Sequence, residues 1–229
     1  MKQPNGEYFE ISVGNDAYKR PFDLALLLFA HILLLPFWIL LWTLIPILIW
    51  LGDRGPIFFS QRRSGKNGRV FIVHKFRTMI PNADSQGPAW TIDGDFRLTR
   101  VGKILRRTAL DELPELWSVL KGDMSFVGPR PLDESEQKQL EGQIPGFYQR
   151  LVVRPGLTGL AQVYDSIDSA SNKFKYDVEY IGQMSPWLDG KLILLSILNS
   201  LGAQWDSRAG KPVESPDVLP DSKTDHLQD

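Results

Sequence analysis

The feature that most constrains this chain is an apolar run of 28 residues, Leu24 to Leu51, that contains no Asp, Glu, Lys or Arg. As one straight helix the run would measure about 42 Å, which exceeds the roughly 30 Å of hydrocarbon in a bilayer. Helices of soluble proteins are rarely apolar on every face. No small-residue cleavage site follows the run, as a secretory signal peptide would require. We therefore predict that this segment lies in a membrane.

Two arrangements of this segment fit the residues: a helix that spans the membrane, and a kinked hairpin that enters and leaves by the cytoplasmic face. Pro36 lies near the middle of the run, where it removes a helix hydrogen bond and favours a kink. Lys19 and Arg20 precede the run and Arg54 follows it, so the flanks lack the charge asymmetry that orients a spanning helix. We also expect the Arg20 side chain to reach the lipid headgroups. The residues alone leave both arrangements open.

The formal net charge of −1 gives no reason to expect a nucleic-acid partner, but the charges are unevenly distributed. Between Gln61 and Arg107 there are eleven Lys or Arg residues and three acids. This excess indicates an anionic ligand or an anionic membrane surface, although a solvated basic face would have the same composition. The chain has no cysteine, so a metal site would need oxygen or histidine ligands.

Beyond the apolar run, the pattern predicts an α/β fold that is mixed and mostly helical. A β-hairpin is expected from two short apolar segments, 57–59 and 70–73, on either side of a Gly-rich turn. Helical spacing of apolar or polar residues predicts four helices, over residues 101–107, 110–120, 133–140 and 187–205.

Three further expectations concern the C-terminal helix, one loop and the C-terminal tail. The helix over 187–205 either packs in the core, which is favoured because its polar face is not rich in Lys or Arg, or lies in the membrane interface. Residues 80–97 read as a polar loop near the site. Residues 206–229 form an acidic, Pro-containing tail that we expect to be disordered.

Asp111 and Glu112 form the acidic pair that most suggests chemistry. We expect a helix to begin just before them, with Pro114 in its first turn, where a missing N–H is tolerated. Carboxylates at a helix start lie beside free backbone N–H groups and the positive end of the helix dipole. Arg106 and Arg107 lie just upstream, where they could keep the carboxylates ionised or bind phosphate. An ionised Asp can serve as a nucleophile or a Mg²⁺ ligand, whereas a solvated helix cap is the ordinary role of such a pair.

Two further segments each present one arginine from a stiff loop. Arg130 stands between two prolines, and Arg154 precedes a Pro-Gly pair. Prolines reduce the entropy that such a loop loses when its guanidinium binds a phosphate. A rigid turn with a structural arginine is the alternative for each. Neither segment has the glycine spacing of a Walker loop or of a dinucleotide-binding fingerprint.

Together these segments resemble the monotopic phosphoglycosyl transferases, the bacterial sugar transferase family that initiates glycan assembly on undecaprenyl phosphate. The resemblance runs from about Lys19 to about Leu201, and several long motifs occur in the order found in the family. The matching segments are KRPFD (19–23), GPIFFSQ (55–61), KFRTM (75–79), LDELP (110–114), the run 120–131 and VRPG (153–156).

The resemblance implies a mechanism. In the family, the Asp of the Asp-Glu pair attacks the β-phosphate of a UDP-sugar, UMP leaves, and polyprenyl phosphate attacks the resulting covalent phosphosugar. Asp111 and Glu112 would be the catalytic residues here, with Asp111 as the nucleophile and both carboxylates near Mg²⁺. The substrate-binding residues would be Lys75, Arg77, Arg106, Arg130, Arg154 and Asp177.

The resemblance also implies an architecture and a location. A re-entrant membrane helix broken at Pro36, a small β-hairpin and interfacial amphipathic helices would surround a compact catalytic domain. That domain would lie on the cytoplasmic face of the bacterial inner membrane, with membrane lipid, a UDP-sugar donor and a polyprenyl phosphate acceptor as partners, and no nucleic acid. Because larger members carry extra N-terminal membrane helices, this chain is expected to be a minimal catalytic form. The expected divisions are an N-terminal segment (1–18), the re-entrant helix (19–53), the catalytic domain (54–205) and the acidic tail (206–229).

Two departures from the family pattern leave the sugar open. Many members have Trp where this chain has Leu160, and an Asn-Gly-Arg-Asn-like stretch where it has Tyr164 to Ile167. The later Phe-x-Tyr-Asp-x-x-Tyr pattern around Asp177 is retained. A membrane-anchored phosphatase or nucleotidyl enzyme and a non-catalytic membrane scaffold stay as alternatives. The glycan pathway and the oligomeric state are also open, with a homo-oligomer among the alternatives.

Overall fold

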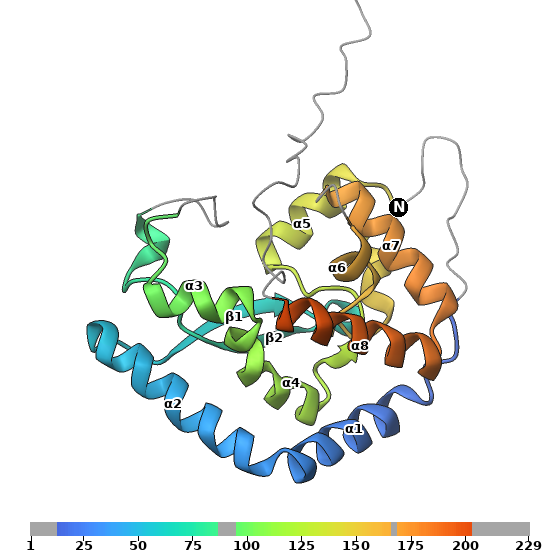
Figure 1. Ribbon diagram of the computed structural model, residues 1–229. Coiled ribbons are helices and arrows are strands. Elements are labelled where there is room, and N and C mark those ends of the chain that lie inside the picture. The colour runs from blue at the N-terminus through green and yellow to red at the C-terminus, as the bar shows by residue number, and fades with distance from the viewer. Residues whose placement is uncertain (1–12, 87–94, 166–168, 203–229) are drawn as a thin grey trace, which may run out of the picture.

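The computed structural model describes residues 13–86, 95–165 and 169–202, which form a mostly helical body with two small sheets (Figure 1). The α-helices are α1 (Lys19–Leu33), α2 (Leu35–Asp53), α3 (Arg100–Arg107), α4 (Leu116–Lys121), α5 (Glu134–Gln143), α6 (Leu160–Tyr164), α7 (Ala170–Gln183) and α8 (Pro186–Leu201). The strands are β1 (Phe58–Ser64), β2 (Val70–Phe76), β3 (Ser125–Val127) and β4 (Gly156–Thr158). Short 3₁₀ helices complete the list: η1 (Lys66–Gly68), η2 (Ala83–Ser85), η3 (Leu110–Glu115) and η4 (Phe147–Val152).

The apolar run folds into two helices that meet at a break, as the position of Pro36 predicts. Leu34 separates α1 from α2 with non-helical backbone angles of −108° and 23°, and Pro36 lies in the first turn of α2, where its missing N–H is tolerated. The His31 ring stacks on Trp38 across the break with centroids 4.7 Å apart. Figure 1 shows the two helices as the arms of a wide V. The break therefore has contacts of its own that hold the angle.

The outer faces of this helix pair are apolar and exposed. Phe29 and Ile32 on α1 and Ile39 on α2 each have more than three fifths of their surface open. Among the described helices, α2 is the one long and apolar enough to cross a membrane, by length and composition. Exposed apolar surface of this extent is typical of a surface that contacts something other than water.

The first residues of α1 are fixed to the body of the protein. Lys19 is buried, and its Nζ donates hydrogen bonds to Asp189 Oδ2 at 2.7 Å and to the backbone carbonyl of Val127 at 2.7 Å. Asp23 accepts from Ser125 Oγ at 3.0 Å. These contacts tie the start of α1 to β3 and to α8.

Contrary to our prediction, the Arg20 side chain does not reach outward. Its guanidinium donates to the backbone carbonyls of Val119 and Leu120, both at 2.5 Å, at the end of α4. The last carbonyls of a helix have no partner within the helix and carry its partial negative charge. That charge holds the Arg20 guanidinium against the protein, whereas the sequence suggested that it would reach the lipid headgroups.

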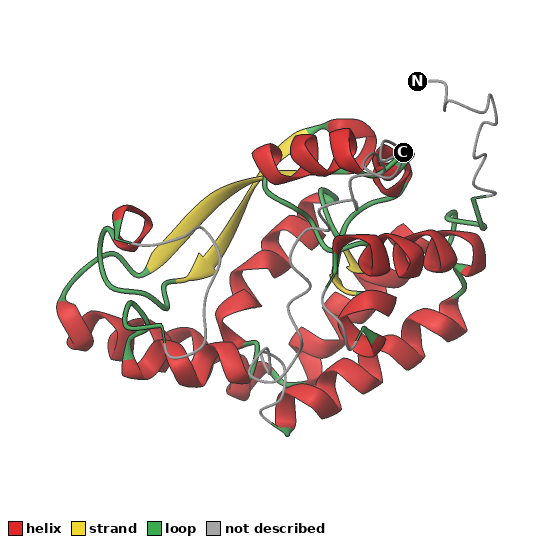
Figure 2. Cartoon of the chain, turned by 90° about the horizontal axis from the view of Figure 1, so that it is seen from above, coloured by secondary structure: helices red, strands yellow, loops and turns green. Residues whose placement is uncertain are grey.

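The predicted β-hairpin is confirmed. β1 and β2 pair antiparallel from Phe58 opposite Phe76 to Ser64 opposite Val70, with η1 at the turn. Figure 2 shows the hairpin as a long two-stranded ribbon set among the helices. The ribbon carries residues 74 to 76 toward η3, so it delivers the basic end of β2 to the acidic pair.

The remaining core lies around the parallel pair β3–β4, where α7 and α8 pack. Val127, Tyr180, Ile181 and Leu192 are buried together in it. The predicted helices over 101–107 and 133–140 are present as α3 and α5. The helix predicted over 187–205 is present as α8, although the end of that range lies outside the described residues.

α8 has one face in the core and one exposed apolar face. Leu192 is fully buried against the core. Leu194, Ile197 and Leu198 are each more than half exposed, and Trp187 at the start of the helix is 87% exposed. The core prediction is right for one face only, because the opposite face is also apolar. The acidic tail over 206–229 lies outside the described residues, as do residues 87–94 of the loop predicted over 80–97.

Candidate active site

The acidic pair lies in η3, which follows α3 after a sharp turn and runs directly into α4. Ala109 makes the turn with a left-handed φ of 55°. We predicted a single α-helix over residues 110–120, but its first half is a 3₁₀ helix. Pro114 lies inside it and has no N–H for an α-helical hydrogen bond, and 3₁₀ turns are common at helix starts. The tighter turn brings three carboxylates together, those of Asp111, Glu112 and Glu115, and all three are buried.

Glu112 is bound by two cations. Lys75 Nζ lies 2.7 Å from Glu112 Oε1, and Arg130 Nη2 lies 2.6 Å from the same oxygen. Lys75 also pairs with Glu115 Oε1 at 3.1 Å. Burial by itself would raise the pKa of Glu112, but the charges of Arg130 and Lys75 outweigh it and hold the pKa well below its usual range. Glu112 is therefore an ionised carboxylate at neutral pH.

Asp111 differs from its neighbour in having a free carboxylate. In the described part of the chain, no hydrogen bond or ion pair reaches it. Burial and the adjacent Glu112 charge raise the pKa of Asp111, while Lys75, Arg106 and Arg130 act in the opposite direction. Two neighbouring carboxyls whose pKa values are pushed apart are typical of groups with different chemical roles. Asp111 has the unbound oxygens and the higher basicity that a nucleophile needs.

Arg106 reaches the site from α3. Its Nε donates a 2.9 Å hydrogen bond to Thr78 Oγ1, just after β2. α3 lies very close to this segment, because a Cβ atom on Gly102 would stand 1.9 Å from the Thr78 carbonyl oxygen. Thr99 caps the helix by accepting from the Gly102 backbone N–H at 2.9 Å. The close approach of α3 thus sets the place of Arg106.

The backbone around Arg130 is held by hydrogen bonds, one of them from the arginine of a buried ion pair. The Gly156 backbone N–H donates to the Pro129 carbonyl at 3.0 Å, next to the β3–β4 pair. Arg150 Nη2 donates to the backbone carbonyl of Arg130 at 2.8 Å, and Arg150 Nε donates to Asp177 Oδ2 at 2.8 Å. Arg150 and Asp177 are both almost completely buried. The pair therefore supports the segment from which the Arg130 guanidinium reaches Glu112.

The structure brings together five of the residues that the sequence selected, namely Lys75, Arg106, Asp111, Glu112 and Arg130. The other three lie elsewhere. Arg77 pairs with Asp53 at the end of α2, and Arg154 Nε donates to the Gly122 carbonyl at 2.9 Å. Asp177 faces Arg150. Among the described residues, none of these three forms a hydrogen bond or ion pair with Asp111 or Glu112.

Sequence reasoning missed two residues of this arrangement. Glu115 follows Glu112 by three positions, a spacing that places two side chains on one face of an α-helix or a 3₁₀ helix, so its closeness to Glu112 could have been read from the sequence. Arg150 has no such signal. It lies 20 residues from Arg130 and 27 from Asp177, and only the fold brings the three together.

A magnesium ion would find suitable oxygen donors here. The described residues contain no group of three or more His, Cys, Asp or Glu side chains placed to hold a metal ion. Mg²⁺, however, is commonly bound by one or two carboxylates together with substrate phosphates and water. The free carboxylate of Asp111 and the second oxygen of Glu112, which the two cations leave open, fit that requirement.

Comparison with known proteins finds a matching family model and several similar bacterial proteins. A family model described as bacterial sugar transferase matches residues 14–203. A UDP-N-acetylgalactosamine-undecaprenyl-phosphate N-acetylgalactosaminephosphotransferase of Aeromonas hydrophila is 39% identical over 76% of this chain and 43% of its own length. A UDP-glucose:undecaprenyl-phosphate glucose-1-phosphate transferase of Caulobacter vibrioides is 38% identical over 85% of this chain and 73% of its own length. An exopolysaccharide production protein of Rhizobium leguminosarum bv. phaseoli is 39% identical over 80% of this chain and 94% of its own length. The chain thus spans less than half of the Aeromonas relative and most of the other two.

Proposed function

Because the chain belongs to the bacterial sugar transferase family, we propose that it moves a sugar 1-phosphate from a UDP-sugar onto undecaprenyl phosphate, releasing UMP. Relatives with this activity in their names support the reaction. The observation that carries the proposal is the free, buried carboxylate of Asp111 beside a second carboxylate whose charge is bound by Lys75 and Arg130.

The first step of the proposed mechanism uses Asp111 as a nucleophile. An Asp111 oxygen forms a bond to the β-phosphorus of the donor, and the bond from that phosphorus to the bridging oxygen breaks. UMP leaves with the bridging oxygen and its electron pair, and the sugar phosphate stays on Asp111 as an acyl phosphate. The raised pKa of Asp111 favours this step, since a more basic carboxylate is the better nucleophile.

The second step uses the acceptor. A phosphate oxygen of undecaprenyl phosphate attacks the same phosphorus, and the bond from phosphorus to Asp111 breaks. The products are a polyprenyl diphosphate sugar and the free carboxylate. Dividing the transfer in this way lets each bulky anion approach in turn, so the site need not hold both at once.

Glu112 serves as the anchor of the cationic cradle. Its Oε1 oxygen accepts from both Lys75 and Arg130, which fixes the two cations close to Asp111. Arg106 adds a third positive group from α3. Fixed positive groups of this kind offset the charge that develops on a transferring phosphate without reorganising during the reaction.

Mg²⁺ is the expected cofactor. When bound, it would neutralise phosphate charge and polarise the β-phosphate oxygens. Asp111 and the open oxygen of Glu112 would hold it. Chelation by EDTA should stop UMP release and added Mg²⁺ should restore it, while Ca²⁺ in place of Mg²⁺ should restore it poorly because Ca²⁺ prefers more ligands at longer distances. Full activity in EDTA would contradict this part of the proposal.

The activity is tested by UMP release from a panel of UDP-sugars in the presence of undecaprenyl phosphate. The named relatives use different sugars, glucose and N-acetylgalactosamine, so both belong in the panel. Release of UDP would indicate an ordinary glycosyl transfer, and release of inorganic phosphate would indicate a phosphatase. Either result would overturn the proposal, and silence with every donor would favour a non-catalytic scaffold.

We further propose that the α1–α2 pair re-enters the membrane from the cytoplasmic face of the bacterial inner membrane. The break at Leu34 supports this, as does the attachment of both ends of the pair to the protein body, Lys19 through Asp189 and Asp53 through Arg77. The chain has no cysteine, so single cysteines can be introduced at Asn15 and Gln139, which are both exposed. A membrane-impermeant maleimide should label both from the cytoplasmic side. Labelling of the two positions from opposite sides would mean that the segment spans the membrane.

A further inference from the structure

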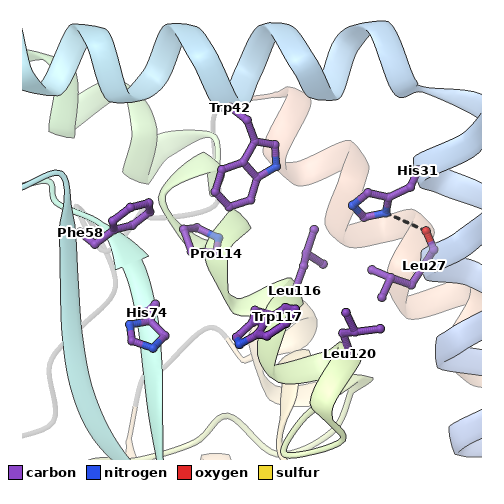
Figure 3. A pocket seen from close by; sticks show the side chains of 9 residues that line it. All are labelled: Leu27, His31, Trp42, Phe58, His74, Pro114, Leu116, Trp117 and Leu120. Carbon is purple, nitrogen blue, oxygen red and sulfur yellow. Dashed lines mark hydrogen bonds between the residues drawn. The ribbon is translucent and has the colours of Figure 1, made fainter.

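An apolar pocket of about 530 Å³ lies inside the V formed by α1 and α2 (Figure 3). Its volume is within the range of roughly 300 to 1,000 Å³ that is usual for small-molecule sites. Leu27 and His31 of α1 form one wall, and Trp42 of α2 forms another. Leu116 and Leu120 of α4 close the side opposite the V. The pocket therefore lies between the helices expected in the membrane and the helix that continues the acidic pair.

Aromatic rings dominate this lining. Trp42, Phe58, Trp117 and the imidazoles of His31 and His74 all face the pocket in Figure 3. Both histidines already have a partner for Nδ1, since His31 contacts the Leu27 carbonyl at 2.7 Å and His74 contacts Ser60 Oγ at 2.8 Å. The pocket thus presents ring faces and aliphatic groups. Flat, polarisable carbon–carbon double bonds pack well on such faces.

The pocket shares two structural elements with the charged site. Pro114 lines the pocket and lies in the same 3₁₀ helix as Asp111 and Glu112. His74 of β2 lines it too, whereas Lys75 lies on the opposite face of the strand, as successive strand residues do. Residues three apart in a 3₁₀ helix lie on one face, so Pro114 shares a face with Asp111. An amphiphile with an anionic head could therefore place its tail in the pocket and its head beside Asp111, within the field of the cations that act on that carboxylate. Charge complementarity at one end and apolar matching at the other point to a single type of ligand.

We propose that this pocket binds the isoprene units nearest the phosphate of the polyprenyl acceptor. The inference rests on the proposed function and names the place where its lipid substrate is recognised. A polyprenyl chain is branched and unsaturated, so it is broader than a saturated acyl chain and carries double bonds for the ring faces. Its phosphate would lie at the η3 end of the pocket, from where it can approach the phosphosugar on Asp111.

Photocrosslinking tests the site without any turnover. The probe is a polyprenyl phosphate with a diazirine on the isoprene unit next to the phosphate, added to the full chain in nanodiscs without donor. Crosslinks should map to the peptides that contain Leu27 to His31 and Leu116 to Leu120. Undecaprenyl phosphate should compete, and phosphatidylglycerol at the same concentration should not. Equal competition by phosphatidylglycerol would mean that the pocket binds ordinary lipid, and crosslinks confined to the outer face of α2 would place the acceptor elsewhere. Both results would overturn the proposal.

A variant that fills the pocket supplies the kinetic test. Leu120→Trp adds a bulky ring at the pocket wall, and Leu194→Trp is the control, since Leu194 is a comparably exposed leucine of α8 that does not line the pocket. We expect Leu120→Trp to raise the KM for the polyprenyl phosphate by about tenfold or more, because several CH₂ groups would lose their burial. The burst of UMP from the first half-reaction should stay unchanged, which also shows that the variant is folded.

The outcomes separate the two proposals. If Leu120→Trp leaves the acceptor KM unchanged, or lowers the UMP burst as much as overall turnover, the pocket is not the acceptor site. If the wild-type chain releases no UMP from any donor, the proposed reaction fails, while the crosslinking pattern still reports whether the pocket binds a polyprenyl phosphate.

Discussion

Arg150 donates a 2.8 Å hydrogen bond from its guanidinium to the backbone carbonyl of Arg130, and this contact links the buried interior to the charged site. Arg150 also donates a hydrogen bond to the carboxylate of Asp177 on α7. The side chain of Arg130 reaches Glu112. The family resemblance implied that Asp177 binds substrate; from its burial against Arg150 we propose that it is a positioning residue that acts through Arg150.

Replacing Asp177 with Asn should therefore lower kcat at least about tenfold, since Arg150 would lose its counter-charge and the Arg130 segment its support. The KM values for donor and acceptor should change much less. Asp189→Asn is the matched control, because Asp189 is another buried carboxylate paired with a cation, Lys19, and has no link to Arg130. Both variants should be compared at equal folded fraction. Equal losses of kcat in the two would show that Asp177 matters only for stability.

Asp111→Asn should remove activity without lowering stability, whereas Glu112→Gln should lower stability. Asp111→Asn should abolish transfer and leave the free energy of unfolding unchanged or higher, since it removes a buried charge that has no direct partner. Glu112→Gln should lower the free energy of unfolding by about 3 kcal/mol, because it leaves Lys75 and Arg130 without their shared carboxylate. Thermal unfolding and UMP release measure the two effects. A transferring Asp111→Asn protein would remove Asp111 as nucleophile.

The stability of the metal-free protein should depend on pH through Asp111. Burial raises the pKa of this carboxyl to about 6 from an ordinary 3.8, so the folded chain holds the proton more tightly than the unfolded chain. Stability contributed by the protonated form is complete below pH 3.8 and is lost as the pH rises to about 6. Relative to Asp111→Asn, the wild type should lose about 3 kcal/mol over this window, at 1.36 kcal/mol for each pKa unit. Parallel stability curves for the two proteins would contradict the raised pKa.

Gly102 should tolerate no side chain. Gly102→Ala would put a Cβ atom into the Thr78 carbonyl and push α3 away from β2, which displaces Arg106 as well. We expect a loss of several °C in Tm and a loss of activity beyond the unfolded fraction. Gly142→Ala in α5 is the control, since nothing lies within 4 Å of its Cβ position and alanine favours a helix by about 1 kcal/mol. A Gly102→Ala protein as stable as Gly142→Ala would show that α3 is free to move.

Much of the secondary structure could be predicted because its signals are local. The hairpin follows from apolar segments around a Gly-rich turn, and the break in the apolar run follows from a proline that cannot continue a helix. Asp111 and Glu112 stood out because they precede Pro114 at a helix start. The 3₁₀ form of that start was missed, since it depends on how β2 and α3 pack against it as well as on the proline.

The role of each arginine could not be predicted in the same way. Arg130 and Arg154 read as candidates for phosphate binding because each lies beside a proline in a stiff loop, and Arg77 was a candidate through the family resemblance. Arg77 forms an ion pair with Asp53, and Arg154 donates a hydrogen bond to the Gly122 carbonyl. Only Arg130 is directed at Glu112.

By itself, the sequence determined that the chain has an apolar, proline-broken segment, a basic stretch and an acidic pair at a helix start, since these depend on residue type and spacing within a few turns. The tertiary structure decided which charges meet. Lys75, Glu112 and Arg130 are 37 and 18 residues apart, and Arg150 and Asp177 support them from still farther along the chain. Coulombic attraction among buried groups depends on distance in space and on the loss of water around them. Both are properties of the folded chain, which is why the free carboxylate of Asp111 could be suspected from the sequence but recognised only in the structure.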